Sequence, residues 1–109
     1  MNSPIAHDVN RSLLGSPVIE ISELVRSFDL KLNVIGKNDS WTAELESEKA
    51  VVGLKQDALD PLVSSPSGHG SSRNAAIAQL CKNLGEKMLI VETGGKRERI
   101  LLPETVVAA

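Results

Sequence analysis

A run of two glycines, one histidine and two serines has the composition of an anion-binding loop. Residues 68–72 (Gly-His-Gly-Ser-Ser) stand directly before a predicted helix, and flexible backbone amides at a helix N-terminus are a natural site for an anion. A dinucleotide-binding loop, however, needs a third glycine and a preceding strand within a βαβ unit. Arg73 stands at the place of the third glycine, a loop with proline and serine precedes the run, and a Walker-type loop is absent. We therefore expect a flexible approach to a capped helix rather than a nucleotide site.

Basic side chains are the second group with chemical potential. Three of them cluster on a predicted hairpin near the C-terminus, and two more lie on the predicted helix that follows the glycine run. Acidic residues alternate with the hairpin cluster and weaken its net field, so a solvated strand face is the simpler interpretation. The candidate contacts for a protein partner or a phosphate are Gly68, His69, Gly70, Ser71, Arg73, Lys82, Lys96, Arg97 and Arg99.

The residue types that usually perform catalysis do not form a recognisable set. His7 and His69 have no cysteine or second histidine at metal-ligand spacing. Cys81 lies on an apolar helix stripe, where a small core residue is the simpler interpretation. Glutamates at positions 44, 46 and 48 could do acid–base work, but an exposed acidic strand edge that discourages pairing is the simpler explanation. We therefore expect a protein that is not an enzyme, with no catalytic residues, no metal and no cofactor.

Composition limits the class of protein further. The chain has 109 residues, 41% of them apolar and 24% charged, which suits one domain with one modest core. Phe28 and Trp41 are the only aromatic residues, so the core must be aliphatic, and aromatic platforms for single-stranded nucleic acid are not expected. The net charge of −2 gives the protein as a whole no attraction to phosphate. One cysteine allows no internal disulfide, and no signal layout or membrane-spanning apolar run is present, so we expect a cytoplasmic protein outside the membrane.

The first half of the chain predicts a helix followed by strands. Apolar residues spaced at i, i+3, i+4 and i+7 favour a helix over residues 17–28 that begins at a serine–proline pair. A strand through residues 18–21 is the alternative. The period then changes to two, which predicts a β-hairpin over residues 29–47 with its turn at residues 36–39. Residues 50–54 are a possible third strand.

The second half predicts a loop, a helix and another hairpin. Residues 55–70 form a long loop with a few apolar residues. A serine cap and an apolar stripe predict a helix over residues 72–84, and Gly85 follows where helices commonly end in a left-handed turn. Residues 87–102 read as a hairpin closed by a Gly-Gly pair able to take positive φ.

These elements indicate an α+β fold, in which a small antiparallel sheet packs with two helices. A single domain is expected over residues 17–103. The remaining residues, 1–16 and 104–109, are expected to be a mobile N-terminal tail and a loose C-terminal tail.

The order of these elements resembles the double-stranded RNA-binding domain. That family has a helix, three antiparallel strands and a second helix entered through Gly-x-Gly-x-Ser, which residues 68–72 match. The resemblance covers residues 17–85 and implies that fold with an extra C-terminal hairpin. The family's lysines at the helix start grip phosphates. Here Arg73 fills one of those places, whereas Asn74 takes the second and Ile77 the third.

The pattern also looks like small uncharacterised phage and prophage proteins. These share a Trp-Thr-x-Glu strand, an Ala-Ile-x-x-Leu helix and a closing hairpin that ends in Leu-Pro, and residues 41–44, 76–80 and 102–103 fit that layout. The likeness covers residues 30–104. It implies a phage accessory context and supplies no biochemical activity.

The sequence therefore predicts a non-catalytic, phage-type binding protein that docks on a host or phage protein. The long loop and the last hairpin are its expected contact surfaces. The alternative is a nucleic-acid-binding module, for double-stranded RNA or DNA, that uses the local basic patch. The identity of the partner and the oligomeric state do not follow from the sequence.

Overall fold

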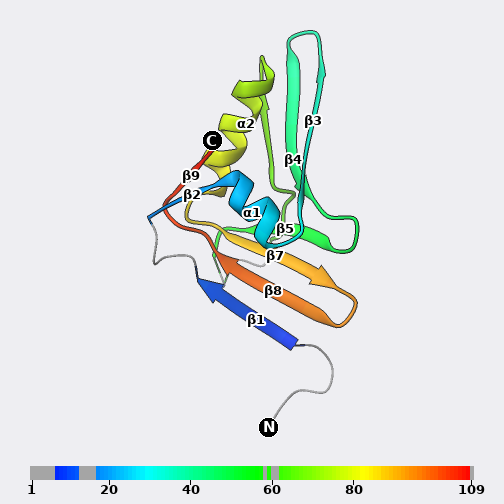
Figure 1. Ribbon diagram of the computed structural model, residues 1–109, viewed down its shortest axis with the longest axis vertical. Coiled ribbons are helices and arrows are strands. Elements are labelled where there is room, and N and C mark those ends of the chain that lie inside the picture. Colours follow the sequence, from blue (N-terminus) through cyan, green and yellow to red (C-terminus); the bar gives the residue numbers. More distant parts are fainter. Residues whose placement is uncertain (1–6, 13–16, 58, 60–61, 109) are drawn as a thin grey trace.

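The computed structural model is an α+β protein built of short strands and two helices (Figure 1). It describes residues 7–12, 17–57, 59 and 62–108. The elements of that part of the chain are β1 His7–Ser12, β2 Val18–Glu20, α1 Ile21–Ser27, β3 Lys31–Lys37, β4 Ser40–Glu46, β5 Val51–Lys55, β6 Ser67–Gly70, α2 Arg73–Leu84, β7 Met88–Thr93, β8 Lys96–Leu101 and β9 Thr105–Val107. The predicted fold class is confirmed.

Within the described residues, the strands form three sheets. Sheet A has the order β1-β8-β7-β5, sheet B consists of β2 and β9, and sheet C has the order β3-β4-β6. Most neighbours run antiparallel, but β1 runs parallel to β8 and β2 parallel to β9. The layout of the double-stranded RNA-binding domain is not confirmed, because β5 pairs with β7 of the other sheet. The third strand beside the first hairpin is β6 instead.

Both predicted hairpins are confirmed. In the first, β3 pairs with β4 and the turn residues are Asn38 and Asp39, where Asn38 takes φ 59°. In the second, β7 pairs with β8 around Gly94 and Gly95. The expectation of positive φ at this Gly-Gly pair is wrong, since no glycine among the described residues has a positive φ. The turn therefore does not need glycine for its conformation.

The N-terminal helix is shorter than predicted. It begins at Ile21 rather than Pro17, and Glu20 precedes it in an extended conformation without a side-chain cap. Residues 18–20, for which a strand was the alternative, form β2 and pair with β9. A parallel partner more than eighty residues away along the chain overrides the local helical period, and no local pattern indicates it.

Both expected tails contain strands. Residues 105–107 form β9, the partner of β2, and residues 7–12 form β1 at the edge of sheet A. These residues were expected to lie in tails, and the structure pairs them as strands instead; residues 1–6, 13–16 and 109 lie outside the described part. A strand that adds to a sheet edge is held by main-chain hydrogen bonds, and it needs no apolar alternation that a sequence pattern would detect.

Helix α2 fits its prediction at the start and departs from it at the end. The Ser72 side chain accepts a hydrogen bond of 3.1 Å from the Ala75 backbone N–H, as an N-cap does. Gly85 is extended, with φ −56° and ψ 133°, and Glu86 takes the left-handed conformation with φ 62°. Glycine is required at position 85 because a Cβ there would lie 2.6 Å from the Glu104 carbonyl oxygen.

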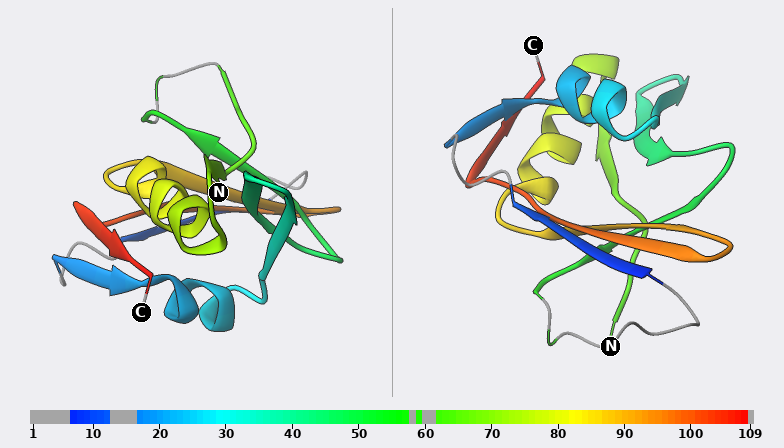
Figure 2. Two further views of the ribbon diagram at one scale, coloured as in Figure 1. Left: turned by 90° about the horizontal axis from the view of Figure 1, so that it is seen from above. Right: turned by 60° about the horizontal axis from the view of Figure 1, so that its bottom comes forward.

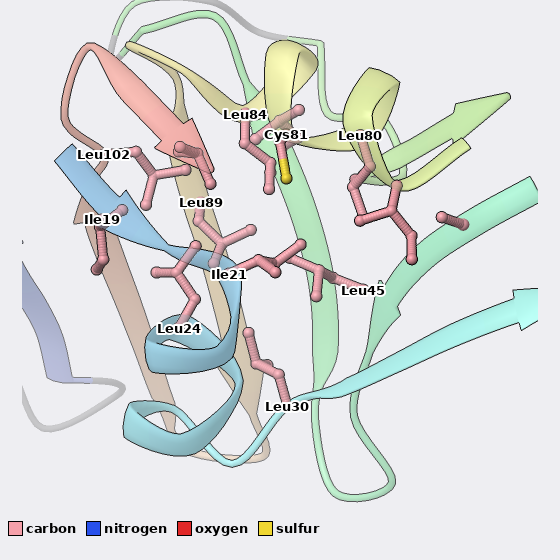
Figure 3. Packing of buried hydrophobic residues seen from close by; sticks show 14 of the residues in the cluster. Ile19, Ile21, Leu24, Leu30, Leu45, Leu80, Cys81, Leu84, Leu89 and Leu102 are labelled. Atoms are coloured by element: carbon pink, nitrogen blue, oxygen red, sulfur yellow. The ribbon is translucent and has the colours of Figure 1, made fainter. Parts of the chain in front are cut away.

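The aliphatic core lies between sheet A on one side and the two helices with sheet C on the other (Figure 2). Leu24 of α1, Leu84 of α2 and Leu89 of β7 are fully buried and point toward one another (Figure 3). Each sheet thus has one face on the core and one face outside. The outer faces are the surfaces on which functional side chains can gather.

Candidate functional site

The glycine run is part of a strand and not a flexible loop. Gly68 and Gly70 lie in β6, which pairs with β4 in sheet C, so the prediction of an unstructured approach is wrong. A Cβ at Gly68 would overlap the Leu80 backbone nitrogen and lie 2.6 Å from the Ala76 carbonyl oxygen. A Cβ at Gly70 would lie 2.6 Å from the Ala76 backbone nitrogen. The two glycines therefore let the backbone of α2 lie directly against the sheet.

The other residues of the run divide between the surface and the helix cap. His69 lies on the outer face of sheet C, where its Nδ1 is 3.1 Å from the Thr42 hydroxyl. Ser71 is exposed, and Ser72 caps the helix. The backbone amide of Ala75 is used by that cap, and His69 is turned to the sheet rather than to the helix N-terminus. The geometry does not build an anion site here.

The five predicted basic contacts do not share one surface. Arg97 and Arg99 lie on one face of β8 by strand alternation. Lys96 lies on the opposite face, 3.7 Å from the Glu98 carboxylate. Arg73 and Lys82 belong to α2, which packs on the other side of the molecule from the outer face of sheet A (Figure 2). The structure brings only Arg97 and Arg99 together.

These two arginines face a cleft of about 440 Å³ on the outer face of sheet A. Residues 63–65 border this cleft beside the free edge of β5, where a two-way backbone bridge joins Leu54 and Ser64 with N···O distances of 2.7 and 2.9 Å. We call this site the sheet A cleft. Its lining residues are Val51, Val52, Gly53, Lys55, Val63, Ser64, Ser65, Ile90, Glu92, Arg97 and Arg99.

The segment of residues 63–65 beside the cleft packs against Gly53. A Cβ at Gly53 would overlap the Val63 Cγ1 atom, so Val63 fills the space that the missing side chain leaves. Ile90 lies beneath as the floor and is 8% exposed, although it faces away from the core. The loop predicted over residues 55–70 is therefore ordered around Val63–Ser65 and ends in β6.

The charges of the cleft are mostly positive. Lys55, Arg97 and Arg99 line it together with one acidic residue, Glu92. The Arg97 Nη2 atom is 3.3 Å from the Glu92 Oε2 atom, with side chains 41% and 48% exposed. A pair this exposed contributes about 0–1 kcal/mol. The Arg97 Nε atom is buried and has no hydrogen-bond partner among the described residues, so the donors of this guanidinium are only partly used.

Exposed apolar side chains gather on the same side of the molecule. Val51 is 73% exposed and Val63 is 58% exposed, and both line the cleft. Leu62 precedes Val63 in the same connection and is 75% exposed, while Leu101 shares its face of β8 with the two arginines. Exposed aliphatic residues next to arginines are the combination that protein–protein interfaces use.

Sequence reasoning found only part of this surface. Lys55, Val51 and Val63 were not among the predicted contact residues, although the long loop that contains Lys55 and Val63 was an expected contact surface. All three line the cleft with Arg97 and Arg99. The signal for them would have been the partner of β5, because cross-strand register places Val51 opposite Glu92 and Gly53 opposite Ile90. That pairing joins segments about forty residues apart, and no sequence pattern within either segment indicates it.

A second, more apolar groove lies between the helices. It has a volume of about 470 Å³ and is lined by Ile21, Ser22, Val25, Leu32, Arg73, Asn74, Ile77 and Ala108. Arg73, one of the predicted contacts, is its only charged lining residue within the described chain. One cation above aliphatic side chains is a weaker combination than the sheet A cleft, where several cations and two exposed valines meet.

The remaining candidate chemistry concerns Cys81 and metals. Burial raises the pKa of the Cys81 thiol above its ordinary value, against a smaller lowering effect of a backbone hydrogen bond. Cys81 is therefore held as a neutral thiol within the core. In the part of the chain that the structure describes, histidine, cysteine and carboxylate side chains form no group of three that could hold a metal ion. Neither of the two described helices is long and apolar enough to cross a membrane.

Comparisons of the chain with models of protein families, with curated proteins and with solved structures find no match.

Proposed function

We propose that the protein is a non-catalytic binding module that docks a protein partner on the outer face of sheet A. The observation that carries the proposal is the sheet A cleft, where exposed aliphatic residues and two arginines line one cavity. Aliphatic anchors beside arginine give both the desolvated area and the directional hydrogen bonds that a specific interface needs. The cleft lies on paired strands, a rigid support for such a surface.

Nucleic acid is the second candidate, and the meeting of Lys55, Arg97 and Arg99 in one cleft is the observation that favours it. Duplex binding needs cations spread along a face that follows the phosphates. The predicted cations are instead divided among β8, its reverse face and α2. This division and the net charge of −2 support a protein partner over a nucleic acid.

The biological setting is a separate part of the proposal. A phage accessory role in the cytoplasm rests on the resemblance of residues 41–44, 76–80 and 102–103 to small phage proteins. In that setting the partner is a host or phage protein. The docking surface is argued from the cleft alone and does not depend on this resemblance.

Site-specific photo-crosslinking tests the docking surface. A photoreactive residue at Val63, in the full chain within a cell lysate, is expected to crosslink one protein in a product that resists nuclease. The matched control is the same residue at Ile35 on sheet C, which is 63% exposed against 58% for Val63. The control position is expected to give no such product.

A second variant shows whether the crosslink depends on the cleft. Val51→Asp adds a carboxylate beside Val63 and is expected to abolish the product, because it removes exposed apolar surface from the cleft and competes with the partner for the basic residues there. Equal products at Val63 and Ile35 would contradict the proposal. A product that disappears with nuclease, together with duplex binding that weakens steeply with salt and is lost in Arg97→Glu, would favour the nucleic-acid alternative.

A further inference from the structure

The net charge of the sheet A cleft is opposite to that of the protein. The cleft is lined by three basic residues and one acidic residue, whereas the whole chain has a net charge of −2. A local surplus of positive charge in a concave site attracts negative groups and repels basic ones. A partner that fits this surface therefore presents carboxylates.

The contact of Arg97 shows which atoms a carboxylate would use. One guanidinium nitrogen, Nη2, is near the Glu92 carboxylate at 3.3 Å, and Nε has no hydrogen-bond partner in the described chain. A guanidinium presents two parallel N–H groups to a carboxylate when both partners are free to align. Neighbouring atoms cover Nε, so a ligand reaches it only if the Arg97 side chain turns. The half-exposed contact with Glu92 is weak enough to permit that turn.

The aliphatic residues define what lies beside the carboxylate. Val51 and Val63 are exposed at the rim of the cleft, and Ile90 forms its floor. A branched aliphatic side chain next to the carboxylate would remove these apolar surfaces from water. A volume of about 440 Å³ holds a few side chains of a peptide.

From these contacts we infer that the sheet A cleft recognises an acidic, aliphatic peptide segment, and that Glu92 competes with the carboxylate of that segment for Arg97. The inference rests on the proposed docking function and names the chemistry of the partner. Glu92 then lowers the affinity for acidic segments, although it lies within the binding surface. Removal of the Glu92 carboxylate is therefore expected to raise the affinity for the segment, whereas removal of a residue that only contacts the partner is expected to lower it.

Fluorescence anisotropy with three labelled hexapeptides tests this inference on the full chain at low salt. The probes alternate valine with glutamate, with glutamine or with lysine. We expect the glutamate–valine peptide to bind most tightly. Arg97→Gln is expected to weaken that binding roughly tenfold, as loss of a charge-assisted contact does. Glu92→Gln is expected to tighten it about threefold, the scale of an exposed ion pair.

A matched variant separates local competition from overall charge. Glu46→Gln removes the same charge on the outer face of sheet C, where Glu46 lies opposite Lys31, and it is expected to change the affinity less than Glu92→Gln does. The emission of Trp41, which lies over Gly36 in sheet C away from the cleft, reports that each variant is folded.

Three results would overturn the inference: tightest binding of the lysine–valine peptide, weaker binding in Glu92→Gln, or no binding of the glutamate–valine peptide to the native chain or to Glu92→Gln. The crosslink at Val63 separates these failures from failure of the docking function. If the Val63 crosslink persists and depends on Val51, the protein still docks a partner there, and only the acidic class of segment is excluded.

Discussion

The outer faces of sheets A and C differ in the charged and apolar side chains that they gather. On sheet C, Lys31 lies opposite Glu46 across the strands, and the Thr42 hydroxyl lies 3.1 Å from the His69 Nδ1 atom. On sheet A, basic residues and exposed valines share one cleft with a single carboxylate. A face whose groups are matched internally has little to offer a ligand. A face with surplus charge and uncovered aliphatic area is the one suited to binding.

The two sheets also differ in what their glycines do. In sheet C, Gly68 and Gly70 admit the backbone of a helix, which cannot move aside. In sheet A, Gly53 admits the tip of the Val63 side chain, which can rotate. The first contact belongs to the folded core and the second to the binding surface. Substitutions at these glycines therefore separate folding from function.

The largest effect is expected for Gly68→Ala. The added methyl group meets backbone atoms of Ala76 and Leu80, so the helix must shift from the sheet and the free energy of unfolding falls by about 3 kcal/mol. Urea denaturation followed by Trp41 emission measures the change. Gly94→Ala is the control, because nothing lies within 4 Å of a Cβ at Gly94. A loss below about 1 kcal/mol for Gly68→Ala would contradict the close contact.

A smaller effect on folding is expected for Gly53→Ala. The new methyl group displaces Val63, whose side chain is 58% exposed and able to rotate, so the free energy of unfolding falls by about 1 kcal/mol. Partner crosslinking through Val63 is expected to fall strongly, because the new methyl group at position 53 displaces the segment around Val63. Unchanged crosslinking with an altered stability would show that docking does not depend on the position of the segment around Val63.

Reversing the charge at Lys31 removes the opposite-charge pair that it forms with Glu46 across the strands of sheet C. Lys31→Glu places two carboxylates on opposite strand positions 31 and 46, and it is expected to cost about 0.5 kcal/mol of stability at low salt. The loss is expected to shrink at high salt, as screening predicts. A thermal melt at two salt concentrations checks it. An equal loss at both would show that charge is not its cause.

The smallest effect concerns Cys81. Because burial raises its pKa, the protonated thiol is favoured in the folded state. This contribution is fully present below the ordinary thiol pKa and is lost as pH rises through the raised value. Stability is thus expected to fall slightly in alkaline solution, and less in Cys81→Ala. Thiol labelling is expected to be slow until denaturant is added; rapid labelling of the native protein would contradict the burial.

Sequence patterns of neighbouring residues predicted both hairpins and helix α2. The alternation in residues 29–47 predicted the first hairpin, the Gly-Gly pair within residues 87–102 predicted the second, and the stripe and serine cap predicted α2. The turn at Asn38 fits the preference of asparagine for positive φ. These features are formed by residues that are close in sequence, so one amino-acid sequence is enough to predict them.

Pairings between distant segments were not predictable in the same way. The pairing of β2 with β9 and that of β1 with β8 convert expected tails into strands, and β5 leaves the first hairpin for β7. Arg97 and Arg99, which line one cleft, were therefore grouped with three basic residues that lie elsewhere. The glycines of the 68–72 run were assigned to anion binding or flexibility because their contact, the backbone of α2, is visible only in space.

One pair of variants tests most directly whether sheet A is the docking surface. Val51→Asp and Ile35→Asp introduce the same charge at exposed strand positions, 73% and 63% exposed, on sheets A and C respectively. Affinity for the protein crosslinked through Val63, measured by titration calorimetry, is expected to fall at least about tenfold in Val51→Asp and to stay within about twofold in Ile35→Asp. Equal losses in both variants, or a larger loss in Ile35→Asp, would contradict the assignment of docking to sheet A.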